Sequence, residues 1–81
     1  MSTKFYVYAL ISLNNSNLYI GQTNNLERRI KQHKSGKVLS TKPYIPYRLL
    51  FEESFSDRKN AVAKEKELKS SQGRRFLRSL L

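Results

Sequence analysis

The sequence contains no cysteine and no tryptophan, and it has a single histidine. The lack of cysteine excludes a disulfide framework and thiolate metal sites, and one histidine cannot build a zinc finger. No apolar run approaches the roughly 20 residues that cross a bilayer, and the lysines are spread along the chain rather than gathered on one amphipathic helix. We therefore expect a cytoplasmic protein with no membrane partner.

Acidic residues are also scarce. Six Asp and Glu stand against sixteen Lys and Arg, so the formal net charge is +10 at pH 7. This excess is larger than solubility requires and favours a polyanionic partner, with a nucleic acid as the first candidate. A chain of 81 residues is long enough for one domain, which we expect to span residues 1–81.

Apolar and aromatic residues in alternation predict three strands. Residues 4–11 are apolar on both faces, which is typical of a central strand. An asparagine-rich turn at 14–17 leads into a second strand around Tyr19, and residues 47–53 form a third strand that begins after two prolines.

The hairpin turn decides which residues of the first two strands face each other. A two-residue turn at 14–15 pairs Tyr8 with Gly21. Tyr8 and Tyr19 then lie diagonally adjacent on one face, and the missing side chain of Gly21 leaves room beside them. A slip of one residue would move the two tyrosines to opposite faces.

A helix is predicted after the second strand, because Asn24 and Glu27 have the spacing of a capping box. At roughly 100° per residue, Arg29 and His33 border its apolar stripe, whereas Arg28 points to solvent. The pattern alone is also compatible with purely structural roles. Arg29 can be a surface arginine whose stem covers the core, and His33 can be a partly buried helix histidine.

A second long helix runs from a cap at Ser56 or Asp57 to about Ser70, and it contains an unusually placed acid. Glu65 falls on the inward face, where a carboxylate is costly unless it is paired or binds a cation. An ion pair with Lys69, four residues on, is the structural alternative to a metal site.

The remaining segment closes the fold. Gly73 is expected to interrupt the second helix, and a short amphipathic helix is expected to follow and pack back on the domain. The predicted fold class is α+β, with a small three-stranded, mainly antiparallel sheet flanked by helices in β-β-α-β-α-α order. The apolar residues of the closing helix are Phe76, Leu77, Leu80 and Leu81.

The singled-out residues resemble, in order and spacing, the GIY-YIG nuclease superfamily over nearly the whole chain. The sequence is most similar to its small stand-alone members, which are related to the nuclease domain of the excinuclease ABC C subunit. Tyr6-Val7-Tyr8 corresponds to the first motif, with Tyr6 where glycine is usual, and Tyr19-Ile20-Gly21 is an unaltered second motif. The full set that carries the resemblance is Tyr8, Tyr19, Ile20, Gly21, Arg29, His33 and Glu65.

The resemblance implies a divalent-metal-dependent DNA endonuclease or nickase of the DNA-repair type, either structure-selective or non-specific. It implies that Glu65 holds one Mg²⁺ or Mn²⁺ and that Arg29 contacts the scissile phosphate. Tyr19 is the expected proton acceptor for the attacking water, and Tyr8 and His33 are expected to orient water or phosphate. The alternative is that His33 is the base. The expected contacts to the DNA backbone are Lys31, Lys34, Lys37, Lys42, Lys69 and Arg74.

Two departures from the family pattern keep a second interpretation open. Gln22 stands where some members carry a lysine, and the segment around Gly73 offers no obvious holder for the late asparagine of many members. The alternative is a catalytically silent nucleic-acid-binding module of the same fold. A basic ribosome-associated protein that prefers RNA is a third class, and it gives no account of an inward Glu65. A partner protein or a homodimer is compatible with each of these interpretations.

Overall fold

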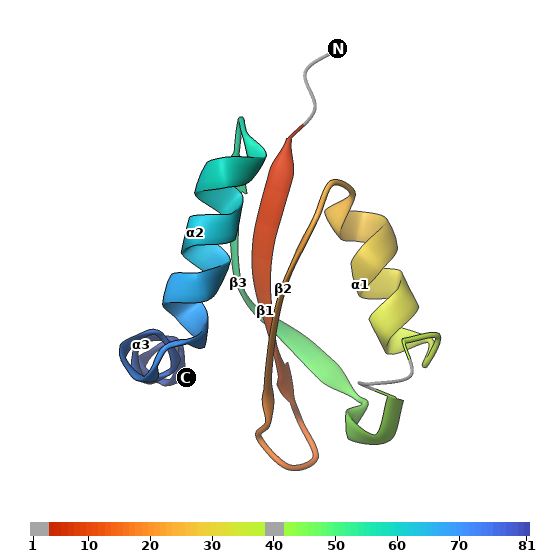
Figure 1. The fold of residues 1–81 in the computed structure, drawn as a ribbon. Coiled ribbons are helices and arrows are strands. Elements are labelled where there is room, and N and C mark those ends of the chain that lie inside the picture. The colour runs from red at the N-terminus through yellow and green to blue at the C-terminus, as the bar shows by residue number, and fades with distance from the viewer. Residues whose placement is uncertain (1–3, 39–41) are drawn as a thin grey trace.

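The computed structural model describes residues 4–38 and 42–81. A three-stranded antiparallel sheet in the order β2-β1-β3 lies at its centre (Figure 1). This architecture confirms the predicted α+β class and the predicted order of elements. The elements are β1 (Phe5–Ser12), β2 (Leu18–Thr23), α1 (Leu26–Lys34), the short 3-10 helix η1 (Lys42–Tyr44), β3 (Tyr47–Phe55), α2 (Arg58–Lys69) and α3 (Ser71–Ser79).

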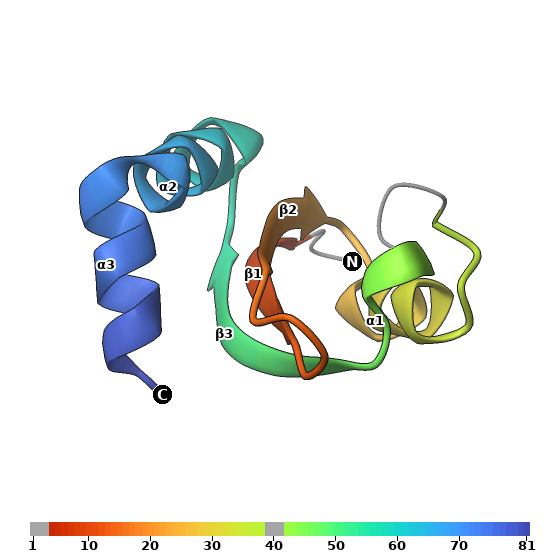
Figure 2. The ribbon, with the colours of Figure 1, turned by 90° about the horizontal axis from the view of Figure 1, so that it is seen from below.

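The helices cover the two faces of the sheet. Figures 1 and 2 show α1 on one face and α2 with α3 on the other. Because side chains alternate along β1, Val7 and Ala9 are buried toward α2 and α3, whereas Tyr8 and Leu10 are buried toward α1. The prediction of a central strand with two apolar faces is therefore confirmed. Within the described ranges, the structure holds no helix with the length and apolar character that a bilayer crossing requires.

The β1–β2 register is the predicted one, and Tyr8 lies opposite Gly21. The predicted two-residue turn is wrong, because residues 13–17 connect the two strands. The Ser12 amide donates to the Asn17 carbonyl at 2.9 Å and closes the loop, and Ser16 adopts the left-handed backbone with φ of 63°. The register is the same in the predicted and the observed hairpin, because the strand pairs of both are centred between residues 14 and 15.

The third strand departs from simple alternation. The pairing of β1 with β3 shifts between Ala9 and Leu10, so that Leu50 forms a bulge. Leu49 packs on the α1 side of the sheet, whereas Leu50 and Phe51 both pack on the α2 side. The bulge lets one strand supply apolar side chains to both layers.

Helix α1 begins one residue later than predicted. The Asn25 side chain, rather than that of Asn24, accepts the N-capping hydrogen bond from the Arg28 amide at 3.1 Å. Glu27 does not complete a capping box, because the third helical position after the Asn25 cap is Arg28. The Glu27 carboxylate pairs instead with Lys31 at 3.5 Å, on the exposed surface of the helix.

The other helix ends follow the sequence signals closely. Gly36 follows the C-cap of α1 with φ of 78°, the left-handed conformation that glycine adopts without steric cost. Asp57, one of the two predicted caps, accepts the Asn60 amide at 2.8 Å and starts α2.

Gly73 does not interrupt a helix, which corrects the sequence-based expectation. The break lies at Ser70, whose hydroxyl donates to the Glu67 carbonyl at 2.6 Å and accepts from the Gly73 amide at 3.1 Å. Gly73 itself lies buried inside the first turn of α3, against the backbone of α2. Of the four apolar residues of the closing segment, only Leu77 is fully buried. The Phe76 ring packs edge-on against Phe51, and three of the four keep exposed surface: Phe76, Leu80 and Leu81.

Candidate active site

The two tyrosines of the sequence motifs meet on the α1 side of the sheet. Their ring centroids are 6.3 Å apart. Gly21 makes this approach possible, because a Cβ atom at that position would lie 2.8 Å from Tyr8 Oη and 3.2 Å from Tyr19 Cε1. The space at Gly21 is thus filled by the phenol of the strand opposite, and a side chain there would displace it.

His33 joins the tyrosines from α1. Its ring is fully buried, its centroid is 4.7 Å from that of Tyr19, and its Nε2 shares a hydrogen bond of 2.9 Å with Tyr8 Oη. Burial, together with the neighbouring charge of Arg29, lowers the pKa of His33 to about 4, so the imidazole is neutral at pH 7. Burial raises the pKa of Tyr8 to about 12, against the opposing effect of a hydrogen bond with Arg29.

Arg29 brings a positive charge to the same cluster. Hydrogen bonding with Tyr8, and more weakly with Tyr19, raises the pKa of the guanidinium, which remains charged at any physiological pH. One nitrogen, Nη1, also donates to Gln32 Oε1 at 3.1 Å, which fixes the plane of the group. A half-buried arginine fork beside two phenols has the geometry to bind an anionic oxygen.

Glu65 approaches from the other layer. It lies on α2, across the sheet from α1, and its side chain is 19% exposed. Its two carboxylate oxygens accept from Gln22 Nε2 at 2.8 Å and from Lys69 Nζ at 3.0 Å. The ion pair with Lys69 that the sequence suggested as an alternative is therefore present.

The edge strand β2 separates Glu65 from the other four candidate residues. Tyr8, Tyr19, Arg29 and His33 form one cluster, whereas Glu65 reaches the edge strand β2 from the opposite face and binds Gln22 there. Four of the five candidate residues therefore share one pocket, and Glu65 on the other face of the sheet does not meet them directly. Glu65 is still close enough for its negative charge to contribute to the raised pKa of Tyr8.

A metal ion at Glu65 would have to be one that binds through only one or two protein ligands. Within residues 4–38 and 42–81, no three acidic or histidine side chains gather around a cation position. Magnesium is often bound through one or two carboxylates, with waters and substrate phosphates completing the octahedron. Glu65 fits that arrangement, since each of its oxygens has one protein partner and Lys69 is half exposed and free to turn away.

The predicted backbone-contact residues divide between the two layers. Lys31, Lys34 and Lys37 are exposed at the end of α1 and just beyond it, and Lys42 is exposed in η1. On the other side, Lys69 pairs with Glu65, and Arg74 Nε donates to the Lys69 carbonyl at 3.3 Å. Positive charge therefore lies on both sides of the β2 edge.

Two residues of the site were missed or misjudged from the sequence. Gln22 was regarded as a lost charge, yet its amide holds Glu65. The signal was its place in β2, two residues after the buried Ile20, which puts both on the α2 face. Tyr47 was assigned to a strand without a role, but its ring packs edge-on against His33, with centroids 6.3 Å apart.

The comparison with known families agrees with this geometry. The model of the GIY-YIG catalytic domain matches residues 4–77. The chain belongs to the GIY-YIG family. GIY-YIG domains form a nuclease family and generally use divalent metals, so a nucleic acid is the class of substrate that membership implies.

Small stand-alone proteins of the family are similar to this GIY-YIG chain over most of their length. A UPF0213 protein of Staphylococcus haemolyticus is 38% identical over 68 residues, which are 83% of this chain and 82% of that protein. A UPF0213 protein of Bacillus licheniformis is 35% identical over 66 residues, covering 80% and 68% of the two chains. The solution structure of a UPF0213 protein from Bacillus halodurans is similar with a TM-score of 0.58, at 35% identity, and covers 95% of this chain and 84% of that one.

Proposed function

We propose that this GIY-YIG protein is a divalent-metal-dependent DNA endonuclease or nickase that selects DNA by structure or cuts it without selectivity. The observation that carries the proposal is the cluster around Gly21. Two phenols, a neutral imidazole and a fixed guanidinium gather where a side chain at position 21 would not fit. Apolar residues could pack in the same space at a lower desolvation cost, so packing alone does not explain this polar cluster.

The roles of the residues follow from their burial and charge. Arg29 donates to the scissile phosphate and neutralises charge that develops on its oxygens. Tyr19, which is half buried, accepts a proton from the attacking water. His33 is a positioning residue, because it has no exposed surface and its Nε2 is engaged by Tyr8. The alternative in which His33 is the base is therefore disfavoured.

Glu65 is the proposed metal ligand, with Gln22 holding one of its oxygens. A bound Mg²⁺ or Mn²⁺ would stabilise the departing alkoxide by Lewis-acid chemistry. The exposed lysines on both sides of β2 supply contacts to the phosphate backbone that do not depend on sequence.

Cleavage of DNA tests the proposal directly. Purified protein is incubated with supercoiled, nicked, flapped and branched DNA and with Mg²⁺ or Mn²⁺, and wild type is compared with Tyr19→Phe and Glu65→Ala. We expect each substitution to reduce the cleavage rate by about 100-fold or more. Glu67→Ala, which removes an exposed carboxylate from the same helix outside the cluster, serves as the matched control and should cut like wild type. Cleavage that survives both site substitutions would indicate a contaminating nuclease and would contradict the proposal.

The second candidate function is a binding module of the same family that no longer cuts. The observation in its favour is that Lys69 and Gln22 occupy both oxygens of Glu65. This module would bind DNA equally well with and without a chelator and would give no product with any substrate of the panel. Lys69→Ala separates the two, because removing the competing ammonium should increase metal-dependent cleavage per bound DNA molecule in a nuclease, whereas a silent module should still give no product.

A further inference from the structure

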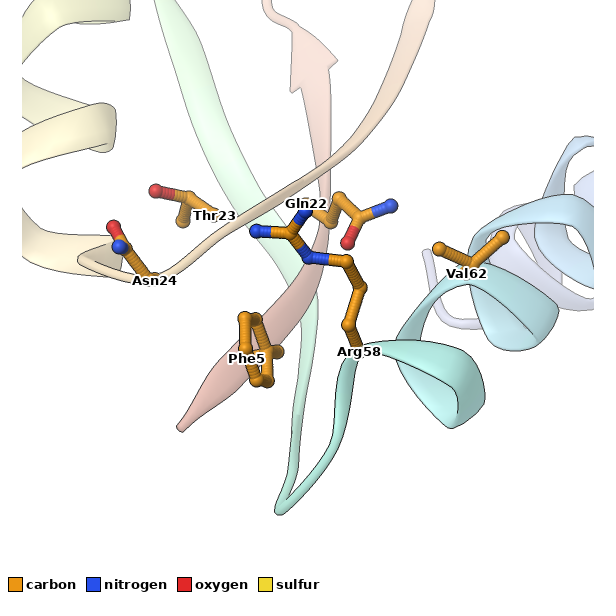
Figure 3. A pocket seen from close by; sticks show the side chains of 6 residues that line it. All are labelled: Phe5, Gln22, Thr23, Asn24, Arg58 and Val62. Carbon is orange, nitrogen blue, oxygen red and sulfur yellow. The ribbon is translucent and has the colours of Figure 1, made fainter. Parts of the chain in front are cut away.

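A second pocket opens beside the site, at the end of the sheet where β1 begins and β2 ends. It has a volume of about 500 Å³ and an open mouth, and its walls come from β1, β2, the start of the turn before α1, and the first turns of α2 (Figure 3). This size is within the range of pockets that hold small ligands. The lining residues are Phe5, Gln22, Thr23, Asn24, Arg58 and Val62.

Arg58 is the charged residue of this pocket. Its guanidinium carbon lies 5.4 Å above the centre of the Phe5 ring, a cation–π arrangement that holds the group in place. Figure 3 shows the side chain extending from α2 toward β2. In the part of the chain that the structure describes, Arg58 forms no ion pair, whereas Lys31, Lys64 and Lys69 do. A guanidinium that is fixed in place and has no ion-pair partner can donate hydrogen bonds to two oxygens of a phosphate.

Gln22 connects the pocket to the candidate active site. This residue lines the pocket, and its amide donates to Glu65. Gly21, the preceding residue of β2, lies against the two tyrosines. A DNA strand whose scissile phosphate sits at the β2 edge would therefore carry its neighbouring nucleotide toward Arg58.

We propose that this pocket binds the nucleotide next to the scissile phosphate, with Arg58 contacting the phosphate of that nucleotide. Val62 and the exposed edge of Phe5 form the apolar wall against which its sugar or base lies, and Asn24 adds an amide at the rim. The open mouth suits one unit of a longer strand. The inference rests on the proposed nuclease function and specifies how the same site grips its substrate.

Binding of a fluorescein-labelled single-stranded oligonucleotide in EDTA tests the pocket without requiring cleavage. We expect Arg58→Ala to weaken binding about 10-fold, since it removes one charge-assisted hydrogen bond to a phosphate. Arg58→Lys should recover part of that affinity, because it keeps the charge but not the fork. Arg75→Ala removes the same charge from an exposed position on α3, near the other end of α2, and should stay within about twofold of wild type. Equal weakening by Arg58→Ala and Arg75→Ala would overturn the proposal.

Photocross-linking tests the nucleotide itself. An oligonucleotide with iodouracil in the strand should form adducts that mass spectrometry assigns to Phe5, and Arg58→Ala should reduce them. Adducts confined to α1 would overturn the pocket assignment. The cleavage assay separates the two proposals: Arg58-dependent binding and cross-linking without any cleavage would remove the nuclease function but retain the pocket. Cleavage with no effect of Arg58→Ala on binding would retain the nuclease and remove the pocket.

Discussion

At the scale of single residues, Gly21 lets the phenol rings of Tyr8 and Tyr19 lie close together, because it has no side chain. A methyl group there would approach Tyr8 Cζ to 3.0 Å and Tyr8 Oη to 2.8 Å. Because Tyr8 is buried and hydrogen-bonded to His33, its ring has little freedom to retreat.

We therefore expect Gly21→Ala to destabilise the fold by about 1–3 kcal/mol and to abolish cleavage even in the folded fraction. Gly36→Ala is the matched control, because it strains a left-handed backbone position outside the site, at a cost of about 1 kcal/mol. Urea unfolding and cleavage rates per folded molecule distinguish the two. Full activity of folded Gly21→Ala would show that the tyrosines need no such close approach.

The buried imidazole of His33 makes stability depend on pH. Its pKa is about 4 in the folded protein and about 6.5 in the unfolded chain, so the unfolded state binds more protons between these values. The stabilisation is fully present above pH 6.5 and is lost as the pH falls toward 4. Between pH 7 and pH 5 we expect the free energy of unfolding to fall by about 2 kcal/mol.

Denaturant titrations of wild type and His33→Phe measure this contribution. The substitution should flatten the pH dependence between pH 7 and pH 5, whatever its effect on absolute stability. An unchanged slope in the variant would mean that other groups cause the acid sensitivity.

At the scale of elements, the α2–α3 junction is the tightest packing that the structure describes around a glycine. A Cβ atom on Gly73 would overlap the Glu67 carbonyl oxygen and the backbone of Leu68. Backbone atoms at a helix end cannot move aside as a flexible side chain can, so the two helices would have to separate.

We expect Gly73→Ala to destabilise the protein by about 3 kcal/mol or more. The neighbouring change Gln72→Ala, at an exposed position of the same helix, should cost less than about 0.5 kcal/mol. Thermal unfolding followed by circular dichroism compares the variants. Similar melting temperatures for both would contradict the tight junction.

Local sequence patterns predicted the helices and strands well, but predicted their ends and the break between α2 and α3 less well. The 3.6-residue period placed Leu26, Ile30 and His33 on one face of α1, and the structure buries that face. Asn24 and Asn25 are both good caps, so only the path of the preceding strand chooses between them. A glycine can end a helix or admit a neighbour, and nothing near Gly73 in the sequence distinguishes the two.

The site itself was predictable where it depends on one hairpin and one helix face. The β1–β2 register and the α1 stripe together bring Tyr8, Tyr19 and His33 into contact. The position of Glu65 depends on which face of the sheet α2 covers, a tertiary choice that periodicity does not encode. Alternation along β2 puts Gln22 on the same face as Ile20, but its hydrogen bond to Glu65 depends on the same tertiary choice.

At the scale of the whole molecule, a net charge of +10 dominates the approach to any polyanion. Binding to DNA releases counterions, so log K falls linearly with log salt. If about four phosphates are contacted, raising the salt from about 50 to about 200 mM should weaken binding about 100-fold.

Fluorescence polarisation in EDTA measures this slope. A variant with Lys34→Ala and Lys37→Ala should show a shallower slope, reduced by at most about 0.9 for each phosphate that is no longer neutralised. Binding that is insensitive to salt would indicate recognition through apolar or hydrogen-bonded contacts instead.

The three-stranded sheet leaves two outer strands that differ in what surrounds them. Strand β2 carries Tyr19, Gly21 and Gln22, so a chain that paired with it would block the candidate active site. Strand β3 is the other edge and carries none of these groups. A protein that joins this sheet by β-augmentation while leaving the candidate site open must therefore add its strand beside β3.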